Sequence, residues 1–213
     1  MPTEDEAPSG LLRITATADF AATVLAEIVT RFVTRYPLVA IDLRLTSDML
    51  DLVAEGIDLA FRHSMKTLAD SSMSARRAMP LHIQLYASPT YLARKGSPRT
   101  PADLAAQEFV VFRTMVRGIR LESGEQVVKL GTPRGRVICD GMAFVRAACL
   151  RGAGIALVPT FLADQDVASG ALVRVLPRWK MRTGDLWLVT PSTERMPRAL
   201  VAFRAFVLEA LKS

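Results

Sequence analysis

The chain has very few of the residues that most often build metal centres and disulfides. Its 213 residues include two cysteines, Cys139 and Cys149, and two histidines, His63 and His82. A zinc site needs about four Cys or His ligands at short spacings, and a disulfide framework needs more than two cysteines. We therefore expect no metal site and no disulfide framework. Both thiols are interpreted as small apolar core side chains.

Long hydrophobic runs and a basic leader are also missing. No segment approaches the roughly 18–20 apolar residues of a membrane span. The first ten residues, MPTEDEAPSG, are acidic and polar, which is the opposite of a signal peptide. We expect a cytoplasmic location and no membrane partner, and we interpret residues 1–10 as a linker remnant.

What the chain does have is a composition typical of a soluble globular protein. Half of it is apolar and 23% is charged, with a net charge of +6. The lysines and arginines are scattered, and only 7% of the residues are aromatic. A basic domain can attract DNA, RNA or small anions, but base stacking needs aromatic rings, which are few here. The net charge is therefore only weak evidence for anionic partners.

The first sixty residues predict alternating strands and helices. Alternating β-prone patterns occupy residues 11–17, 39–45 and 57–61. Residues 19–36 carry apolar side chains at helical spacing. Residues 47–56 predict a short helix with Ser47 or Asp48 as N-cap and Gly56 as its stop. This β-α-β-α-β series predicts a sheet with parallel strands.

The remaining residues predict a second α/β series. Strands are expected at 82–89, 109–112, 135–140, 154–159, 171–177 and 185–191, and a hairpin at 119–130. Helices are expected at 90–96, 101–107 and 142–152, and a closing helix follows from Pro197.

The glycines of Gly152-Ala153-Gly154 suggest a nucleotide-binding loop. A dinucleotide fingerprint, however, follows a strand and opens a helix, so that the helix N-terminus meets the phosphates. Here the glycines follow a predicted helix and precede a strand. We therefore predict a helix stop and expect no nucleotide or other cofactor.

No catalytic constellation stands out. The nucleophile motif G-x-S-x-G is absent. Asp48 and Asp51 are typical of a solvated face, and Asp58 of a surface cap. His63 follows a predicted strand and is a candidate for lining a ligand cleft, whereas His82 is interpreted as structural. We expect no enzymatic activity.

Four segments carry a family resemblance: RYPLVAIDL, LVAEGIDLAFR, ASPTYLARKGSPRTPADLA and RGAGIALVP. In this order they resemble the effector-binding domain of LysR-type transcriptional regulators. The match runs from about Gly10 to the C-terminus.

This resemblance implies an α/β fold of two Rossmann-like subdomains joined by two crossover strands, of the type II periplasmic-binding-protein kind. Residues 11–87 and 187–213 would form subdomain I, and residues 88–186 subdomain II. It implies a small-molecule effector in the inter-lobe cleft and a homodimer or homotetramer, with the helix at 19–36 as a candidate interface. DNA would be bound only through an N-terminal helix-turn-helix that this chain lacks.

In an open α/β sheet, ligands bind beyond the carboxyl ends of the strands, where helix N-termini favour anions. The family match places the following residues there: Thr17, Ala18, Asp19, Thr46, Ser47, Arg62, His63, Asp140, Gly141 and Met142. Hydroxyls would donate hydrogen bonds, Arg62 would offer a fork to a carboxylate or carbonyl, and Met142 an adaptable apolar wall.

Several of these residues could instead have a purely structural role. Asp19, Ser47 and Asp140 are also ordinary helix N-caps, and Arg62 could pair with an acidic residue. The family often has serine in place of Asp19 and asparagine in place of Asp140, so a neutral, aromatic or cationic effector stays open. A free-standing solute-binding protein and an enzyme on the same fold are the alternative functions.

Overall fold

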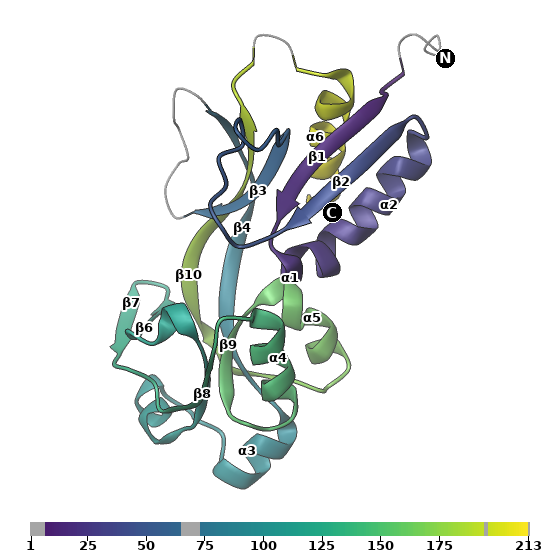
Figure 1. Ribbon diagram of the computed structural model, residues 1–213. Helices are drawn as coiled ribbons and strands as arrows, with labels where there is room; N and C mark the ends of the chain where they lie inside the picture. The colour runs from purple at the N-terminus through teal and green to yellow at the C-terminus, as the bar shows by residue number, and fades with distance from the viewer. Residues whose placement is uncertain (1–6, 65–72, 194–195, 213) are drawn as a thin grey trace. The chain divides into compact units, whose positions relative to one another are not determined.

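The computed structural model describes residues 7–64, 73–193 and 196–212 (Figure 1). The chain divides into two compact units. Unit 1 comprises Met1–Pro80 and Gly184–Ser213, and unit 2 comprises Leu81–Thr183. These boundaries fall inside two long strands, β4 (Met73–Ala87) and β10 (Val173–Pro191), which the units share. The sequence placed the boundaries at 87/88 and 186/187.

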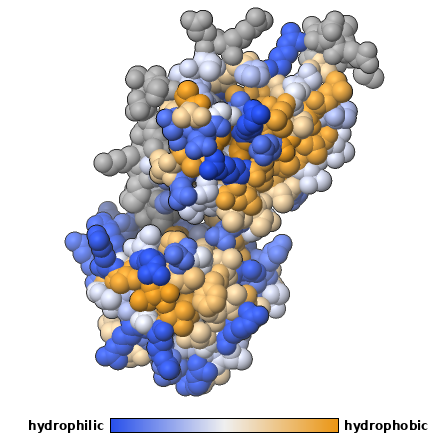
Figure 2. All heavy atoms as spheres, viewed as in Figure 1, coloured by the Kyte–Doolittle hydropathy of each residue, from blue (hydrophilic) through white to orange (hydrophobic). Residues whose placement is uncertain are grey.

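Unit 1 is built on a sheet whose central strands are parallel, as predicted. β1 (Gly10–Ala16) pairs in parallel with β2 (Val39–Leu45) and with β3 (Leu59–Ser64). β10 then pairs antiparallel with β3. Figure 2 shows apolar side chains gathered over β1 and β2, where Leu11 and Leu45 are about half exposed.

The segment after β1 is helical from Ala18 to Arg35, but its second turn is wide. A short α1 (Ala18–Phe20) leads into a π-helical turn (Ala21–Leu25) and then α2 (Ala26–Arg35). α2 packs on the closing helix α6 (Arg198–Ala210), where the rings of Phe32 and Phe203 pack edge to face with their centroids 4.9 Å apart. Aromatic packing therefore fixes both helices on this unit.

The helix predicted at residues 47–56 was wrong, because this segment forms a single turn. The Asp51 carboxylate accepts hydrogen bonds from the N–H groups of Val53 and Ala54, and Gly56 ends the turn at φ 63°. Leu52 is buried, but Met49 and Val53 are 80% and 64% exposed. With one buried anchor the segment has no apolar face to hold a longer helix.

Unit 2 has a sheet in the order β4-β9-β5-β8 with a hairpin attached. Its strands are β5 (Phe109–Phe112), β6 (Ile119–Ser123), β7 (Gln126–Leu130), β8 (Gly135–Cys139) and β9 (Ile155–Pro159). Its helices are α3 (Pro89–Lys95), the 3₁₀ turns Pro101–Ala106 and Arg113–Met115, α4 (Met142–Leu150) and α5 (Thr160–Ala168).

The predicted helix stop at Gly152 is confirmed. The N–H of Gly152 donates to the carbonyl of Cys149, and the N–H of Ala153 to that of Ala148, with Gly152 at φ 78°. This is the Schellman arrangement that glycine favours. The glycines therefore end α4, whereas the glycines of a dinucleotide fingerprint open a helix.

Two features of unit 2 were not expected from the sequence. α5 was missed because one of its buried positions, Asp166, is a carboxylate that interrupts the apolar pattern. The two late strands predicted at 171–177 and 185–191 are parts of one continuous strand, β10.

Candidate ligand-binding site

The carboxyl ends of the three parallel strands meet at one edge of the unit 1 sheet. Ala16 at the end of β1 lies opposite Leu45 at the end of β2. The N–H of Thr46 also donates to the carbonyl of Ala16, at 2.9 Å. This register brings Thr17 and Thr46 to neighbouring positions, as the sequence predicted for such an edge.

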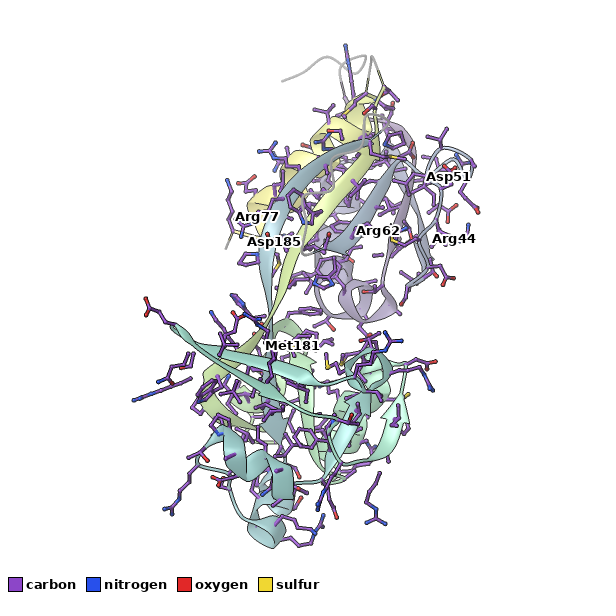
Figure 3. The ribbon with its side chains drawn as sticks, turned by 90° about the vertical axis from the view of Figure 1, so that its left-hand side faces the viewer. Arg44, Asp51, Arg62, Arg77, Met181 and Asp185 are labelled. Carbon is purple, nitrogen blue, oxygen red and sulfur yellow. The ribbon has the colours of Figure 1, made fainter. Side chains whose placement is uncertain are left out.

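Arg62 lies on β3 near this edge and is buried (Figure 3). Its side chain is 8% exposed, and its Nη2 atom has no hydrogen-bond partner. Burial lowers the pKa of the Arg62 guanidinium, although an arginine stays charged at neutral pH. Among the residues that the structure describes, no carboxylate forms an ion pair with it, so the predicted alternative of an acidic partner has no support.

Two further buried polar atoms share the sheet face of Arg62. Trp187 on β10 lies directly opposite Arg62, and Thr15 on β1 lies opposite Ala60, two residues before Arg62. The Trp187 Nε1 and the Thr15 Oγ1 have no hydrogen-bond partner either. Leaving a buried donor unpaired costs about 1–3 kcal/mol. Thr15 and Trp187 were not predicted as site residues from the sequence, although both are polar groups inside apolar strand patterns.

His63 does not join this group. Successive side chains of a strand point to opposite faces, so His63 lies on the face of Phe61, away from Arg62. The ring of Phe61 packs against that of Phe20 beside the start of α1, with the two ring centroids 5.3 Å apart. The exposed His63 therefore lies with the helix face of the sheet.

At the first strand-to-helix corner, Thr17 is the N-cap of α1, and Ala18 is its first residue. The prediction of Asp19 as a possible N-cap was wrong, because Asp19 lies inside the first turn. The Thr17 hydroxyl makes no capping hydrogen bond. It is exposed and available to a ligand.

At the second corner, Thr46 and Asp48 form a closed local pair. The Thr46 hydroxyl accepts from the Asp48 N–H and donates to the Asp48 carboxylate, each at 3.0 Å. Ser47 is exposed and caps no helix, since no helix forms here. Both proposed caps, Ser47 and Asp48, were therefore wrong for a physical reason: Asp51 closes the turn instead.

In unit 2, Gly141 and not Asp140 is the N-cap of α4. The Gly141 N–H donates to the Cys139 sulfur at 3.3 Å. Asp140 is exposed and lies 3.8 Å from the exposed Arg113, a pair of small energetic weight. Met142 is buried in the unit 2 core and packs with Val145.

Cys149 is a buried core thiol, in agreement with the sequence interpretation. It donates a hydrogen bond to the carbonyl of Tyr86, and burial raises the pKa of its thiol to about 12. Cys139 is partly buried. Within the described ranges, no three His, Cys, Asp or Glu side chains gather as metal ligands, and no helix is long and apolar enough to cross a membrane.

Two α/β units that share two long strands, with polar groups at the ends of parallel strands, define the class of ligand-binding domains with a periplasmic-binding-protein-like fold. Comparison with known families matches residues 5–212 to the LysR substrate binding domain, and the chain belongs to this family.

Its relatives are transcription regulators. The chain is 32% identical over 202 residues to the HTH-type transcriptional regulator PtxR of Pseudomonas aeruginosa, a match that covers 94% of this chain and 63% of PtxR. It is 29% identical over 210 residues to the regulator CrgA of Neisseria meningitidis, covering 97% of this chain and 69% of CrgA. The chain thus spans about two thirds of the length of these relatives.

Solved structures share the fold. The regulatory domain of AphB from Vibrio vulnificus superposes with a TM-score of 0.79 at 25% identity, covering 95% of this chain and 98% of that domain. The regulatory domain of CrgA from Neisseria meningitidis gives a TM-score of 0.79 at 26% identity, with 96% and 100% covered.

Proposed function

We propose that this chain is the effector-binding regulatory domain of a LysR-type transcriptional regulator and senses a small metabolite at the carboxyl edge of its strands. The observation that carries the proposal is the buried Arg62, whose Nη2 atom has no partner. A buried guanidinium N–H that has no hydrogen-bond acceptor among the described residues is costly. An effector that accepts its hydrogen bond would remove that cost.

The chemistry of the edge favours an effector with a carboxylate or carbonyl group. Arg62 donates only, and its planar fork matches a carboxylate in two parallel hydrogen bonds. The exposed Thr17 hydroxyl would add a further donor. Ala18, Asp19, Thr46 and Ser47 are the other proposed contacts at this edge of unit 1, whereas His63, also predicted from the sequence, lies on the sheet face opposite Arg62. Asp140, Gly141 and Met142 are the proposed contacts of unit 2.

Oligomerisation is the second part of the proposal. The apolar side chains of Leu11, Leu38 and Leu45 are about half exposed or more on unit 1, and the covering of such groups favours association. The threonines of α2 give little evidence for an interface, because the Thr30 and Thr34 hydroxyls donate hydrogen bonds to carbonyls of their own helix. We propose a homodimer or homotetramer, with DNA bound by a helix-turn-helix of the full-length regulator.

A thermal-shift screen of metabolites tests effector binding. A ligand that binds the folded state raises the melting temperature by mass action. The screen is run on the wild type, on Arg62→Met, and on Arg13→Met, which removes an exposed arginine from the same sheet. We expect a carboxylate or carbonyl compound to stabilise the wild type and Arg13→Met, and Arg62→Met much less. An equal shift in all three proteins would contradict the role of Arg62.

Oligomeric state is tested by size-exclusion chromatography with light scattering. The expected mass is at least twice that of the 23.3 kDa chain at tens of micromolar protein. A strict monomer would contradict this part of the proposal and leave effector binding to its own test.

A further inference from the structure

Unit 2 contains an apolar hollow that the proposed effector site does not use. Its volume is about 300 Å³, and its walls are Leu104, Ala105, Phe109, Ile119, Leu130, Gly131, Thr132, Pro133 and Arg134. Leu104, Phe109 and Ile119 are core residues whose side chains are almost fully buried. Figure 2 shows apolar side chains gathered on unit 2 over the region where β6, β7 and β8 lie in Figure 1.

The mouth of this hollow is cationic. Arg134 also lines a second hollow with Lys95, Arg136 and Glu108. Glu108 lies 3.2 Å from Lys95 and 4.0 Å from Arg136, so one carboxylate faces two of the three cations. Arg134 forms no ion pair with any carboxylate of unit 2 that the structure describes. An apolar wall therefore adjoins an exposed guanidinium that has no counter-charge.

The two hollows lie at the amino ends of their strands. β5 and β8 are parallel, with Phe109 and Gly135 near their starts and Phe112 paired with Cys139 at their ends. The candidate residues Asp140, Gly141 and Met142 follow the carboxyl end of β8. At about 3.3 Å per residue, the length of the strand, on the order of 15 Å, separates the two places. The hollow is thus a separate feature of unit 2.

We propose that this hollow binds a small carboxylic acid with an apolar body, and that Arg134 pairs with its carboxylate. A charge-assisted bond to Arg134 would fix one end, while burial of the apolar body against Leu104, Phe109 and Ile119 would supply the remaining affinity. The volume of about 300 Å³ is roughly ten times the share of one water molecule, so the ligand has on the order of ten non-hydrogen atoms. A medium-chain fatty acid or an aromatic acid has this size and chemistry.

Isothermal titration calorimetry with sodium octanoate tests the proposal. We expect a dissociation constant between about 10 µM and 1 mM for the wild type, given the size of the ligand. Octylamine, which has the same chain and the opposite charge, is expected to bind at least about tenfold more weakly, because Arg134 repels it.

Three variants place the binding in this hollow. Arg134→Ala removes the cation and is expected to weaken octanoate binding about tenfold or more. Ala105→Trp fills the hollow from an exposed position on the Pro101–Ala106 turn and is expected to abolish binding. Arg117→Ala removes an exposed arginine that lines neither hollow and is expected to leave the affinity unchanged.

Circular dichroism and thermal unfolding of each variant show that it is folded before titration. The proposal is overturned if octanoate fails to bind the wild type, if octylamine binds equally well, or if Ala105→Trp and Arg134→Ala bind octanoate like the wild type. Octanoate binding that is lost in Arg62→Met but kept in Arg134→Ala would also overturn it, since the carboxylate would then occupy the unit 1 edge.

Discussion

The two units treat their buried polar groups differently. In the described residues of unit 1, four buried side-chain atoms, on Thr15, Arg62, Trp187 and Thr190, lack a hydrogen-bond partner. Three of these four lie on one face of neighbouring strands. Because unpaired buried groups are rare in folded proteins and need an explanation, this concentration is informative.

Unit 2 instead pairs several of its buried polar groups with its own residues. The buried Tyr91 hydroxyl donates to Gln107 at 2.8 Å and accepts from the Glu108 N–H at 2.9 Å. Arg146 of α4 and Asp166 of α5 form a two-pronged ion pair at 2.6 and 2.7 Å. In unit 1, by contrast, the Arg62 Nη2, the Trp187 Nε1 and the Thr15 Oγ1 have no hydrogen-bond partner among the described residues.

Breaking the Arg146–Asp166 pair tests the claim that unit 2 depends on its internal partners. Arg146→Ala leaves the Asp166 carboxylate, whose side chain is 11% exposed, without its partner. We expect the free energy of unfolding to fall by about 3 kcal/mol, measured by urea denaturation. Arg120→Ala, which removes the more exposed partner of Glu122, is the control and should cost less than about 1 kcal/mol. Equal losses would contradict the contrast.

Gly154 tests how closely unit 2 is packed. A Cβ atom at this position would lie 2.7 Å from the carbonyl oxygen of Glu108, which is held by the N–H of Ile155. We expect Gly154→Ala to destabilise the protein by about 2 kcal/mol, because backbone must shift. Gly131→Ala, whose Cβ would meet nothing within 4 Å, should change stability by less than about 0.5 kcal/mol. A tolerated Gly154→Ala would show that the strands separate easily.

Arg62→Met tests the opposite expectation for unit 1. Replacing a buried guanidinium whose Nη2 atom has no partner by an apolar side chain of similar length should not destabilise the ligand-free protein. We expect the free energy of unfolding to rise by about 1 kcal/mol, while the response to effector is lost. Urea denaturation without ligand measures this. A fall of more than about 2 kcal/mol would mean that the Arg62 guanidinium has a structural partner.

The ion pairs that unit 1 does form lie at its surface. Arg44 and Glu55 are joined at 2.6 Å, but their side chains are 54% and 43% exposed. We expect Arg44→Ala to change the free energy of unfolding by about 0.5 kcal/mol or less. A double-mutant cycle with Glu55→Ala measures the interaction energy between the two side chains. An interaction energy above about 1.5 kcal/mol would contradict the small contribution expected of this exposed pair.

Local sequence patterns predicted much of this fold. Apolar alternation located β1 and β2, and the apolar run FVVF located β5. The helix stop at Gly152 followed from the position of glycine between a helix and a strand. The failures have tertiary causes. The turn at Asp51 replaced a helix because its neighbours stay exposed, and α5 was hidden by Asp166, whose partner Arg146 lies twenty residues away.

Only part of the candidate site could be predicted from the sequence. The parallel register brings Thr17 and Thr46 to one edge, as expected from strand ends. That Arg62 is buried with its Nη2 atom unpaired, and that it shares a face with Trp187, depends on the pairing of β3 with β10 across more than a hundred residues. No local pattern contains that pairing.

Unit 1 is built from two separate stretches of the chain, so we expect the two units to fold in a fixed order during synthesis. Unit 2 is one continuous segment, Leu81–Thr183, but unit 1 needs Gly184–Ser213 to supply part of β10 and all of α6. At about 5–20 residues per second, translation from residue 81 to the end takes roughly 7–26 seconds. During that time β3 lacks its antiparallel partner β10, and Phe32 of α2 lacks its contact with Phe203 of α6. We expect unit 2 to become protease-resistant on the ribosome before unit 1, and we expect chaperones to bind the unfinished N-terminal part.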